Sequence, residues 1–129
     1  MKIEHVALYV KDLERVRFFY ETWFQAKAGE KYVNPTKNFQ SYFLSFENGC
    51  RLELMHQPQV PENQNDVEKQ SLGLIHFAVS VGSVEKVDEM TAQLRLAGHP
   101  ILGEPRWTGD GYYESVILDP EGNRIEITV

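Results

Sequence analysis

A histidine and a glutamate recur at matching places in the two halves of the chain. His5 and His76 each begin a stretch of similar pattern, 71 positions apart, and Glu53 and Glu126 each follow a glycine-containing turn, 73 positions apart. Core packing does not require polar side chains to be copied in a repeat. Imidazole nitrogen and carboxylate oxygen are ligands of borderline divalent ions. The repeat therefore predicts that His5, Glu53, His76 and Glu126 form one metal site.

The ligand set predicts a reactive site rather than a structural one. Two neutral imidazoles and two carboxylates balance the charge of a divalent ion, and an octahedral ion with four protein ligands keeps two positions open. Open positions are typical of catalytic sites. Such an ion can bind two neighbouring substrate oxygens and stabilise the charge that develops on them. Glu126 and Glu53 are then the candidate catalytic bases.

Other polar residues have simpler interpretations. His56 and His99 lack counterparts in the repeat and are predicted to be surface residues. Arg51 and Arg124 recur close to the turns, where arginines are usually solvated or paired with a carboxylate. Cys50 is predicted to be a packing residue, because no histidine is placed to activate its thiol.

The strands and helices expected around these residues occur in the same order in both halves of the chain. Side chains alternate between the two faces of a strand. The histidine of each first strand and the glutamate of each last strand are therefore expected on equivalent sheet faces, which line one cleft if the two sheets curl toward each other. The pattern predicts an α+β fold of tandem βαβββ units that form curved mixed sheets around a metal cleft. We expect one domain over residues 1–129, made of unit one (1–57), a linker (58–70) and unit two (71–129). A tandem repeat of this kind buries its apolar faces by packing copies together.

Hydrophobic periodicity gives the individual elements. Helices are expected over 13–24 and 84–97, and a polar loop containing Trp107 over 104–111. Strands are expected over 3–10, 30–33, 39–46, 50–56, 74–81, 100–102, 112–118 and 123–129.

Composition excludes several classes of function. The net charge is −6 and no basic run occurs, which argues against nucleic-acid binding. A single cysteine allows no internal disulfide and fits a reducing compartment. No apolar stretch approaches the roughly 20 residues of a membrane span, and the N-terminus enters a strand pattern at once, without a signal peptide. We expect a cytoplasmic protein with a small-molecule substrate.

Four segments resemble the glyoxalase/bleomycin-resistance/extradiol-dioxygenase superfamily, also called vicinal oxygen chelate proteins. They are IEHVAL (3–8), VRFFY (16–20), LIHFAV (74–79) and DPEGNRIE (119–126). Carried over one at a time, the metal positions of the superfamily fall on His5, Glu53, His76 and Glu126. Glutamate at position 53 resembles bacterial glyoxalase I (lactoylglutathione lyase), whereas epimerases of this fold often carry glutamine there and stay an alternative.

The resemblance implies an activity and an assembly. The expected function is isomerisation of a hemithioacetal formed from a 2-oxoaldehyde, such as methylglyoxal, and a small thiol. The expected cofactor is one divalent ion per site (Ni, Zn or Co). The expected assembly is a homodimer with shared sites, in which His5 and Glu53 of one chain meet His76 and Glu126 of the other.

Two positions depart from bacterial glyoxalase I. Tyr9 stands where an arginine usually binds a glutathione carboxylate, and Gln57 replaces an asparagine. Arg106, Arg51 or Lys11 is expected to take over that role, or the thiol differs. Two other functions stay open: a thiol transferase acting on an epoxide antibiotic, and a non-catalytic small-molecule-binding protein.

Overall fold

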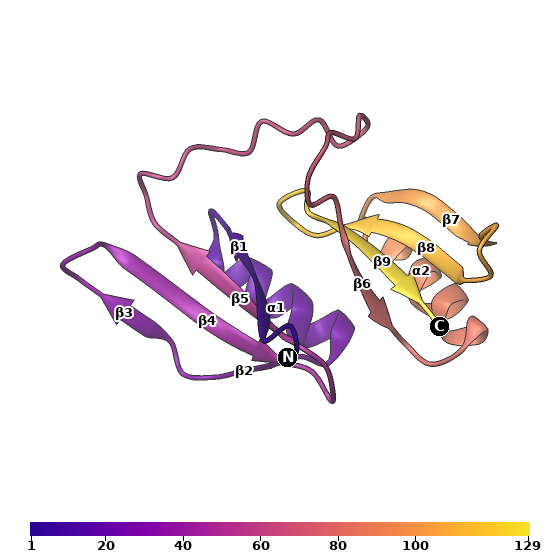
Figure 1. The fold of residues 1–129 in the computed structure, drawn as a ribbon, viewed down its shortest axis with the longest axis horizontal. Helices are drawn as coiled ribbons and strands as arrows, with labels where there is room; N and C mark the ends of the chain where they lie inside the picture. The colour runs from indigo at the N-terminus through magenta and orange to yellow at the C-terminus, as the bar shows by residue number, and fades with distance from the viewer. The chain divides into compact units, whose positions relative to one another are not determined.

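Each half of the chain combines one amphipathic helix with one mixed β-sheet (Figure 1). The computed structural model describes residues 1–129 and divides into two compact units, Met1–Asn63 and Gln64–Val129. Neither helix has the length and apolar character that a transmembrane span needs. The predicted α+β class with two mixed sheets is confirmed.

Unit one contains a five-stranded sheet and helix α1. Its elements are β1 (His5–Tyr9), α1 (Leu13–Phe24), β2 (Lys27–Ala28), β3 (Tyr32–Asn34), β4 (Phe39–Ser45) and β5 (Arg51–His56). The sheet order is β1-β5-β4-β2, and β3 pairs with β4. Strands β1 and β5 are parallel, whereas β4 and β5 are antiparallel.

Helix α1 covers one face of this sheet. It begins after Asp12, whose side chain accepts a hydrogen bond from the backbone of Arg15 at 2.9 Å, as an N-cap does. Its buried residues are Leu13, Val16, Phe19, Tyr20 and Phe24. Leu52 and Leu54 of β5 are also buried, and α1 packs against β5. Because side chains alternate along a strand, Glu53 is left on the opposite face.

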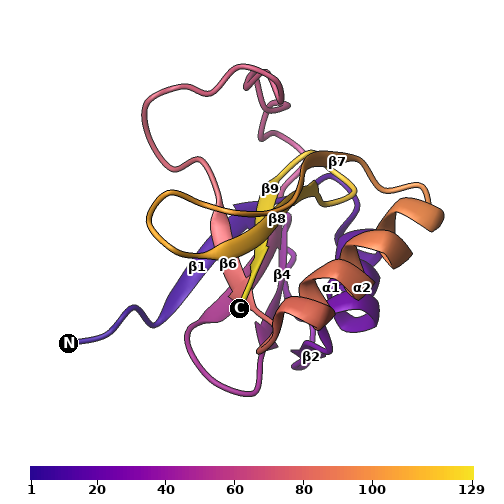
Figure 2. The same ribbon diagram turned by 90° about the vertical axis from the view of Figure 1, so that its right-hand side faces the viewer.

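Unit two contains a four-stranded sheet and helix α2. Its elements are β6 (Phe77–Ser80), α2 (Val84–Leu96), β7 (Ile101–Trp107), β8 (Tyr113–Leu118) and β9 (Arg124–Thr128), and the sheet order is β6-β9-β8-β7. Helix α2 lies against β7, β8 and β9 (Figure 2). At this contact the buried hydroxyls of Thr91 and Ser115 are hydrogen-bonded at 2.7 Å, so neither polar group is buried unsatisfied.

The turn between β8 and β9 explains the DPEGN segment in structural terms. Asp119 is 3% exposed. Its carboxylate accepts hydrogen bonds from the backbones of Glu121 and Asn123, both at 2.9 Å, and from the Asn123 amide at 2.8 Å. Gly122 has φ = 84°, a conformation that glycine adopts without steric cost. This turn sets the point at which β9 begins.

The structure corrects two predicted elements. Residues 104–107 are not a loop but the second half of β7. This strand contains Gly103 and Pro105, but it is the edge strand of its sheet and its pairing with β8 shifts register at two places. Edge strands with bulges accommodate both residue types. Two short strands, β2 and β3, replace the single strand expected over 30–33.

Candidate metal centre

In unit one, His5 and Glu53 lie on the same sheet face. The parallel pairing of β1 and β5 sets Ala7 opposite Glu53 and His5 opposite Arg51. The His5 Nε2 atom lies 3.8 Å from Glu53 Oε2, and the side chains are 39% and 15% exposed. The small side chain of Ala7 leaves space beside the carboxylate, so the histidine two residues earlier reaches it.

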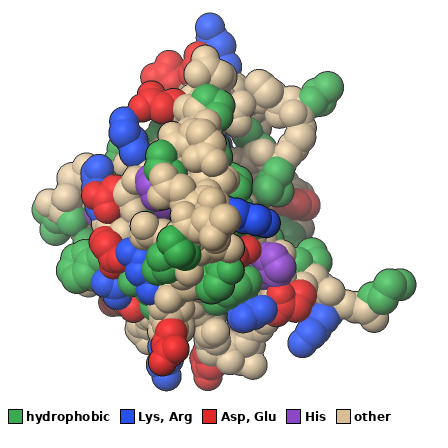
Figure 3. All heavy atoms as spheres, turned by 90° about the vertical axis from the view of Figure 1, so that its left-hand side faces the viewer, with side chains coloured by type: hydrophobic (Ala, Val, Ile, Leu, Met, Phe, Trp, Pro, Cys, Tyr) green, Lys and Arg blue, Asp and Glu red, His purple; other side chains and the backbone are tan.

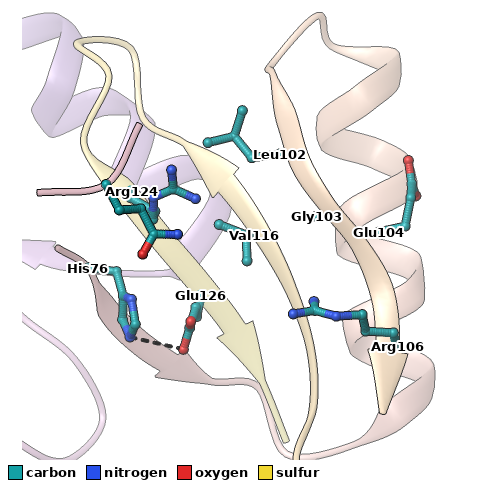
Figure 4. A pocket seen from close by; sticks show the side chains of 9 residues that line it. His76, Leu102, Gly103, Glu104, Arg106, Val116, Arg124 and Glu126 are labelled. Carbon is teal, nitrogen blue, oxygen red and sulfur yellow. Dashed lines mark ion pairs between the residues drawn. The ribbon is translucent and has the colours of Figure 1, made fainter. Parts of the chain in front are cut away.

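Unit two repeats this arrangement. Ala78 of β6 lies opposite Glu126 of β9, and His76 immediately precedes β6. The His76 Nε2 atom lies 3.2 Å from Glu126 Oε2, with exposures of 36% and 18% (Figure 4). Histidine side chains reach the surface on the face drawn in Figure 3. The sequence placed His76 inside a strand, whereas the structure places it on the segment that leads into one.

The distances suit two ligands of one ion. Ligand bonds of about 2.1 Å that meet at 90–109° place the two donor atoms about 3.0–3.4 Å apart. The 3.2 Å separation in unit two lies in this range. The 3.8 Å separation in unit one is wider, and a small rotation of the Glu53 side chain would close the difference while His5 keeps its place. Each pair can therefore chelate a divalent ion through one nitrogen and one oxygen.

Each unit alone supplies only half of the predicted ligand set. The structure brings the four residues together in two pairs, and no cluster of three or more histidine, cysteine, aspartate or glutamate side chains is arranged to hold a metal. The geometry of the separate units does not test whether all four residues bind one ion, so the single site stays a prediction.

Three further side chains surround His5. Its Nδ1 atom lies 2.5 Å from Glu4 Oε2, and Arg51 donates from Nε to Glu4 Oε1 at 2.8 Å. The Arg51 guanidinium lies over the Phe43 ring, 4.1 Å from its centroid, and the His5 ring meets Phe43 edge to face at 5.4 Å. The hydrogen bond from His5 and the charge of Arg51 lower the pKa of Glu4.

Beside His76 and Glu126 there is an open hollow of about 440 Å³. Its lining residues are Gln70, His76, Leu102, Gly103, Glu104, Arg106, Val116, Arg124 and Glu126. In Figure 4, Arg106 extends from β7 toward β8, and Arg124 lies on β9. A carboxylate or another anion entering this hollow meets positive charge close to the His–Glu pair.

The electrostatic setting of Glu126 differs from that of an ordinary surface glutamate. Burial raises the pKa of its carboxyl above the ordinary value, and the charge of Glu114 raises it further. The positive charges of His76, Arg106 and Arg124 act in the opposite direction but do not cancel the increase. Binding of a cation by the two oxygens of Glu126 would compensate the cost of keeping this group ionised.

Three cationic side chains were predicted as possible contacts for a carboxylate of the thiol, and the structure gives each a different partner. Lys11 forms an ion pair with Glu62 at 2.7 Å, and Arg51 is engaged by Glu4. Arg106 lines the hollow and lies 3.5 Å from its partner, Glu114. Arg106 is therefore the best placed of the three for an incoming anion.

The remaining candidates have structural partners. The Gln57 amide donates to the carbonyl of Lys37 at 3.1 Å. His56 was expected on the surface, but it is half-buried and its Nδ1 atom lies 3.0 Å from the Val10 carbonyl oxygen. Arg124 donates to the Val67 carbonyl at 2.7 Å. Sequence reasoning missed Glu4, although its position next to His5 was an available signal.

The chain resembles known proteins over nearly its whole length. The sequence model of the Glyoxalase/Bleomycin resistance protein/Dioxygenase superfamily matches residues 2–127. The uncharacterized protein YqjT of Bacillus subtilis (strain 168) is 29% identical over 128 residues, which are 97% of this chain and 96% of YqjT.

Solved structures of glyoxalase I share the fold. The trypanothione-dependent glyoxalase I of Leishmania major is 25% identical with a TM-score of 0.77, over 99% of this chain and 86% of that chain. Glyoxalase I from Zea mays is 24% identical with a TM-score of 0.79, but this chain spans only 44% of the maize chain. Together with the sequence match over nearly the whole length, these findings show that the chain belongs to the Glyoxalase/Bleomycin resistance protein/Dioxygenase superfamily.

Proposed function

We propose that the protein is a divalent-metal-dependent, glyoxalase I-like lyase that isomerises the hemithioacetal of a 2-oxoaldehyde and a small thiol. One observation carries the proposal: both units set a histidine and a glutamate side by side in the same strand register, with Ala7 opposite Glu53 and Ala78 opposite Glu126. A duplicated structural frame alone would not need to preserve both polar groups.

In this proposal His5, Glu53, His76 and Glu126 hold one divalent ion, for which Ni, Zn and Co are the candidates. The nitrogen and oxygen donors suit these borderline ions. A divalent ion held by these residues would supply Lewis acidity toward the two neighbouring oxygens of the substrate, which would acidify the hydrogen on the adjacent carbon. A ligand set of two histidines and two carboxylates also leaves coordination positions for those oxygens.

The carboxylates of Glu126 and Glu53 are the proposed proton carriers. One of them removes the proton from the first carbon of the substrate and delivers it to the neighbouring carbon, while the hydroxyl proton passes from the oxygen of the first carbon to that of the second, so that no proton is gained or lost overall. Both carboxylates are better shielded than the histidines beside them. Shielding from bulk water favours return of the same proton to the substrate.

We propose that the active form is a homodimer with shared sites. Each unit contributes one histidine–glutamate pair to the proposed site, and two ligands are too few to hold a catalytic ion well. In the proposed dimer, His5 and Glu53 of one chain complete the site with His76 and Glu126 of the second chain. A two-fold symmetric dimer is the commonest oligomer and would contain two such sites.

Arg106 is the proposed contact for an anionic group of the thiol. It reaches the hollow that also contains His76 and Glu126, whereas Tyr9 supplies no positive charge. The trypanothione dependence of the Leishmania major enzyme is a reason to test thiols other than glutathione.

The test is reconstitution followed by a substrate panel. Purified protein would be stripped of metal, loaded separately with Ni²⁺, Co²⁺ and Zn²⁺, and assayed with methylglyoxal and several thiols. Formation of a 2-hydroxyacyl thioester by loaded protein, and not by stripped protein, would support the proposal. Absence of turnover with every metal and thiol, together with thiol addition to an epoxide phosphonate, would move the protein to the transferase class.

A further inference from the structure

We propose that Glu4 is a positioning residue that fixes the orientation and the tautomer of His5 for metal binding. This inference rests on the metal site of the proposed function and adds the side chain that prepares one ligand of that site. It is argued from the contacts that Glu4 makes with His5 and Arg51 and that Phe43 makes with the same two residues.

The two nitrogens of His5 face different partners. Its Nδ1 atom lies 2.5 Å from a Glu4 oxygen, and its Nε2 atom faces Glu53 at 3.8 Å. A neutral imidazole carries one proton, so donation from Nδ1 to Glu4 leaves the lone pair of Nε2 free on the side of Glu53. Metal-binding histidines commonly donate their other N–H to a carboxylate in this way.

Glu4 is itself held in place. Arg51 donates to its other oxygen at 2.8 Å while stacking on the Phe43 ring at 4.1 Å. The same ring meets the edge of His5 at 5.4 Å. The contacts therefore run from His5 through Glu4 and Arg51 to Phe43 and back to His5, and they restrain the imidazole on two sides.

Unit two has no equivalent of this arrangement. Ile75 stands at the place of Glu4, and its side chain has no atom that accepts a hydrogen bond from His76. Val116 stands opposite Glu126 as Phe43 stands opposite Glu53. Arg124 recurs, but it donates to the Val67 carbonyl. The carboxylate is thus an addition to unit one and not a consequence of the repeat, which makes the two halves of the site unequal.

The role of Glu4 is separable from folding. Glu4 is exposed, and exposed ion pairs contribute little to stability. The Glu4→Ala variant should therefore fold normally. Glu62→Ala is a matched control, because Glu62 is an exposed carboxylate of the same unit that is paired with Lys11.

The first measurement is the Zn²⁺ affinity of the full-length protein in competition with a chelator. Glu4→Ala should weaken the affinity on the order of 10- to 100-fold. Glu4→Gln should cost less, since its amide oxygen still accepts the Nδ1 proton, and Glu62→Ala should bind Zn²⁺ as the wild type does. His5→Ala serves as the reference for loss of the ligand itself.

The second measurement needs no metal. In metal-free protein at a pH where His5 is neutral, ¹⁵N–¹H NMR of the imidazole should show the proton on Nδ1 in the wild type and largely on Nε2 in Glu4→Ala. Unchanged Zn²⁺ affinity and tautomer in Glu4→Ala, with affinity lost in His5→Ala, would overturn the role of Glu4 and leave the metal site intact. Unchanged affinity in His5→Ala would instead overturn the metal site and, with it, this inference.

Discussion

The carboxylate of Glu126 lies 3.2 Å from the imidazole of His76, although the two residues come from opposite ends of unit two. The parallel pairing of β6 with β9 creates this proximity, because it places Ala78 opposite Glu126. The same pairing of β1 with β5 brings Glu53 toward His5. The strand order that makes each sheet mixed is thus also what assembles each half of the proposed site.

Changing Glu126 to Gln should reduce kcat by on the order of 10²-fold or more if Glu126 is the base, because glutamine keeps the shape of the side chain but cannot accept the proton. Circular dichroism should show an unchanged fold. The control is Glu89→Gln on the exposed side of α2, which should leave kcat unaltered. Unchanged turnover in Glu126→Gln would transfer the base role to Glu53 or end the catalytic interpretation.

The same variant should change how stability depends on pH in metal-free protein. Burial raises the pKa of Glu126 in the folded state, so the folded state binds this proton more tightly than the unfolded state does. The wild type therefore loses unfolding free energy, relative to Glu126→Gln, as the pH rises through the raised pKa. Thermal unfolding of both proteins from about pH 4 to about pH 7 should show the Tm difference growing in favour of the variant. A difference that does not vary with pH would contradict the assigned burial of the charge.

Substituting Arg106 with Gln should raise KM for a thiol that carries a carboxylate by about 10-fold, the loss of one charge-assisted hydrogen bond, and should change kcat less. Arg15→Gln is the control, since Arg15 is an exposed residue of α1 and does not line the hollow. If a thiol without a carboxylate shows the same increase in KM, Arg106 acts on the shape of the site rather than on that anion.

Much of this arrangement could be predicted from the sequence. The periodicity of Leu13, Val16, Phe19, Tyr20 and Phe24 gave helix α1 with its observed bounds, because one face of a helix against a sheet leaves a strong pattern. The His–Glu pairing followed from the repeat combined with strand alternation. In both cases the signal was local and was copied in the second unit.

The features that were not predicted from the sequence depend on how strands pair in the sheet. The residues of one segment alone do not determine that pairing. The second half of strand β7 was predicted to be a loop, because Gly103 and Pro105 are tolerated in a strand only through its edge position and register shifts. The contact of Glu4 with His5 was missed because neighbouring strand residues ordinarily face opposite sides of a sheet, and Glu4 precedes the first residue of β1.

Mixing two inactive variants tests the proposed shared sites. His5→Ala and Glu126→Ala chains would be unfolded, combined in equal amounts and refolded together. If the sites are shared, one site of each mixed dimer carries both changes and the other carries none, so random pairing restores about a quarter of the sites. If each site lies within one chain, every site keeps one defect and mixing restores no activity.

The most direct test of the central claim is the metal content of the protein and of four single variants. Wild-type protein dialysed with Zn²⁺ and analysed by mass spectrometry of the element should hold one tightly bound ion per chain. His5→Ala, Glu53→Ala, His76→Ala and Glu126→Ala should each lose most of it while remaining folded, because the four residues are proposed to share one ion. Retention of wild-type metal content by any of the four folded variants would contradict the assignment of that residue as a ligand, and retention by all four would contradict the site.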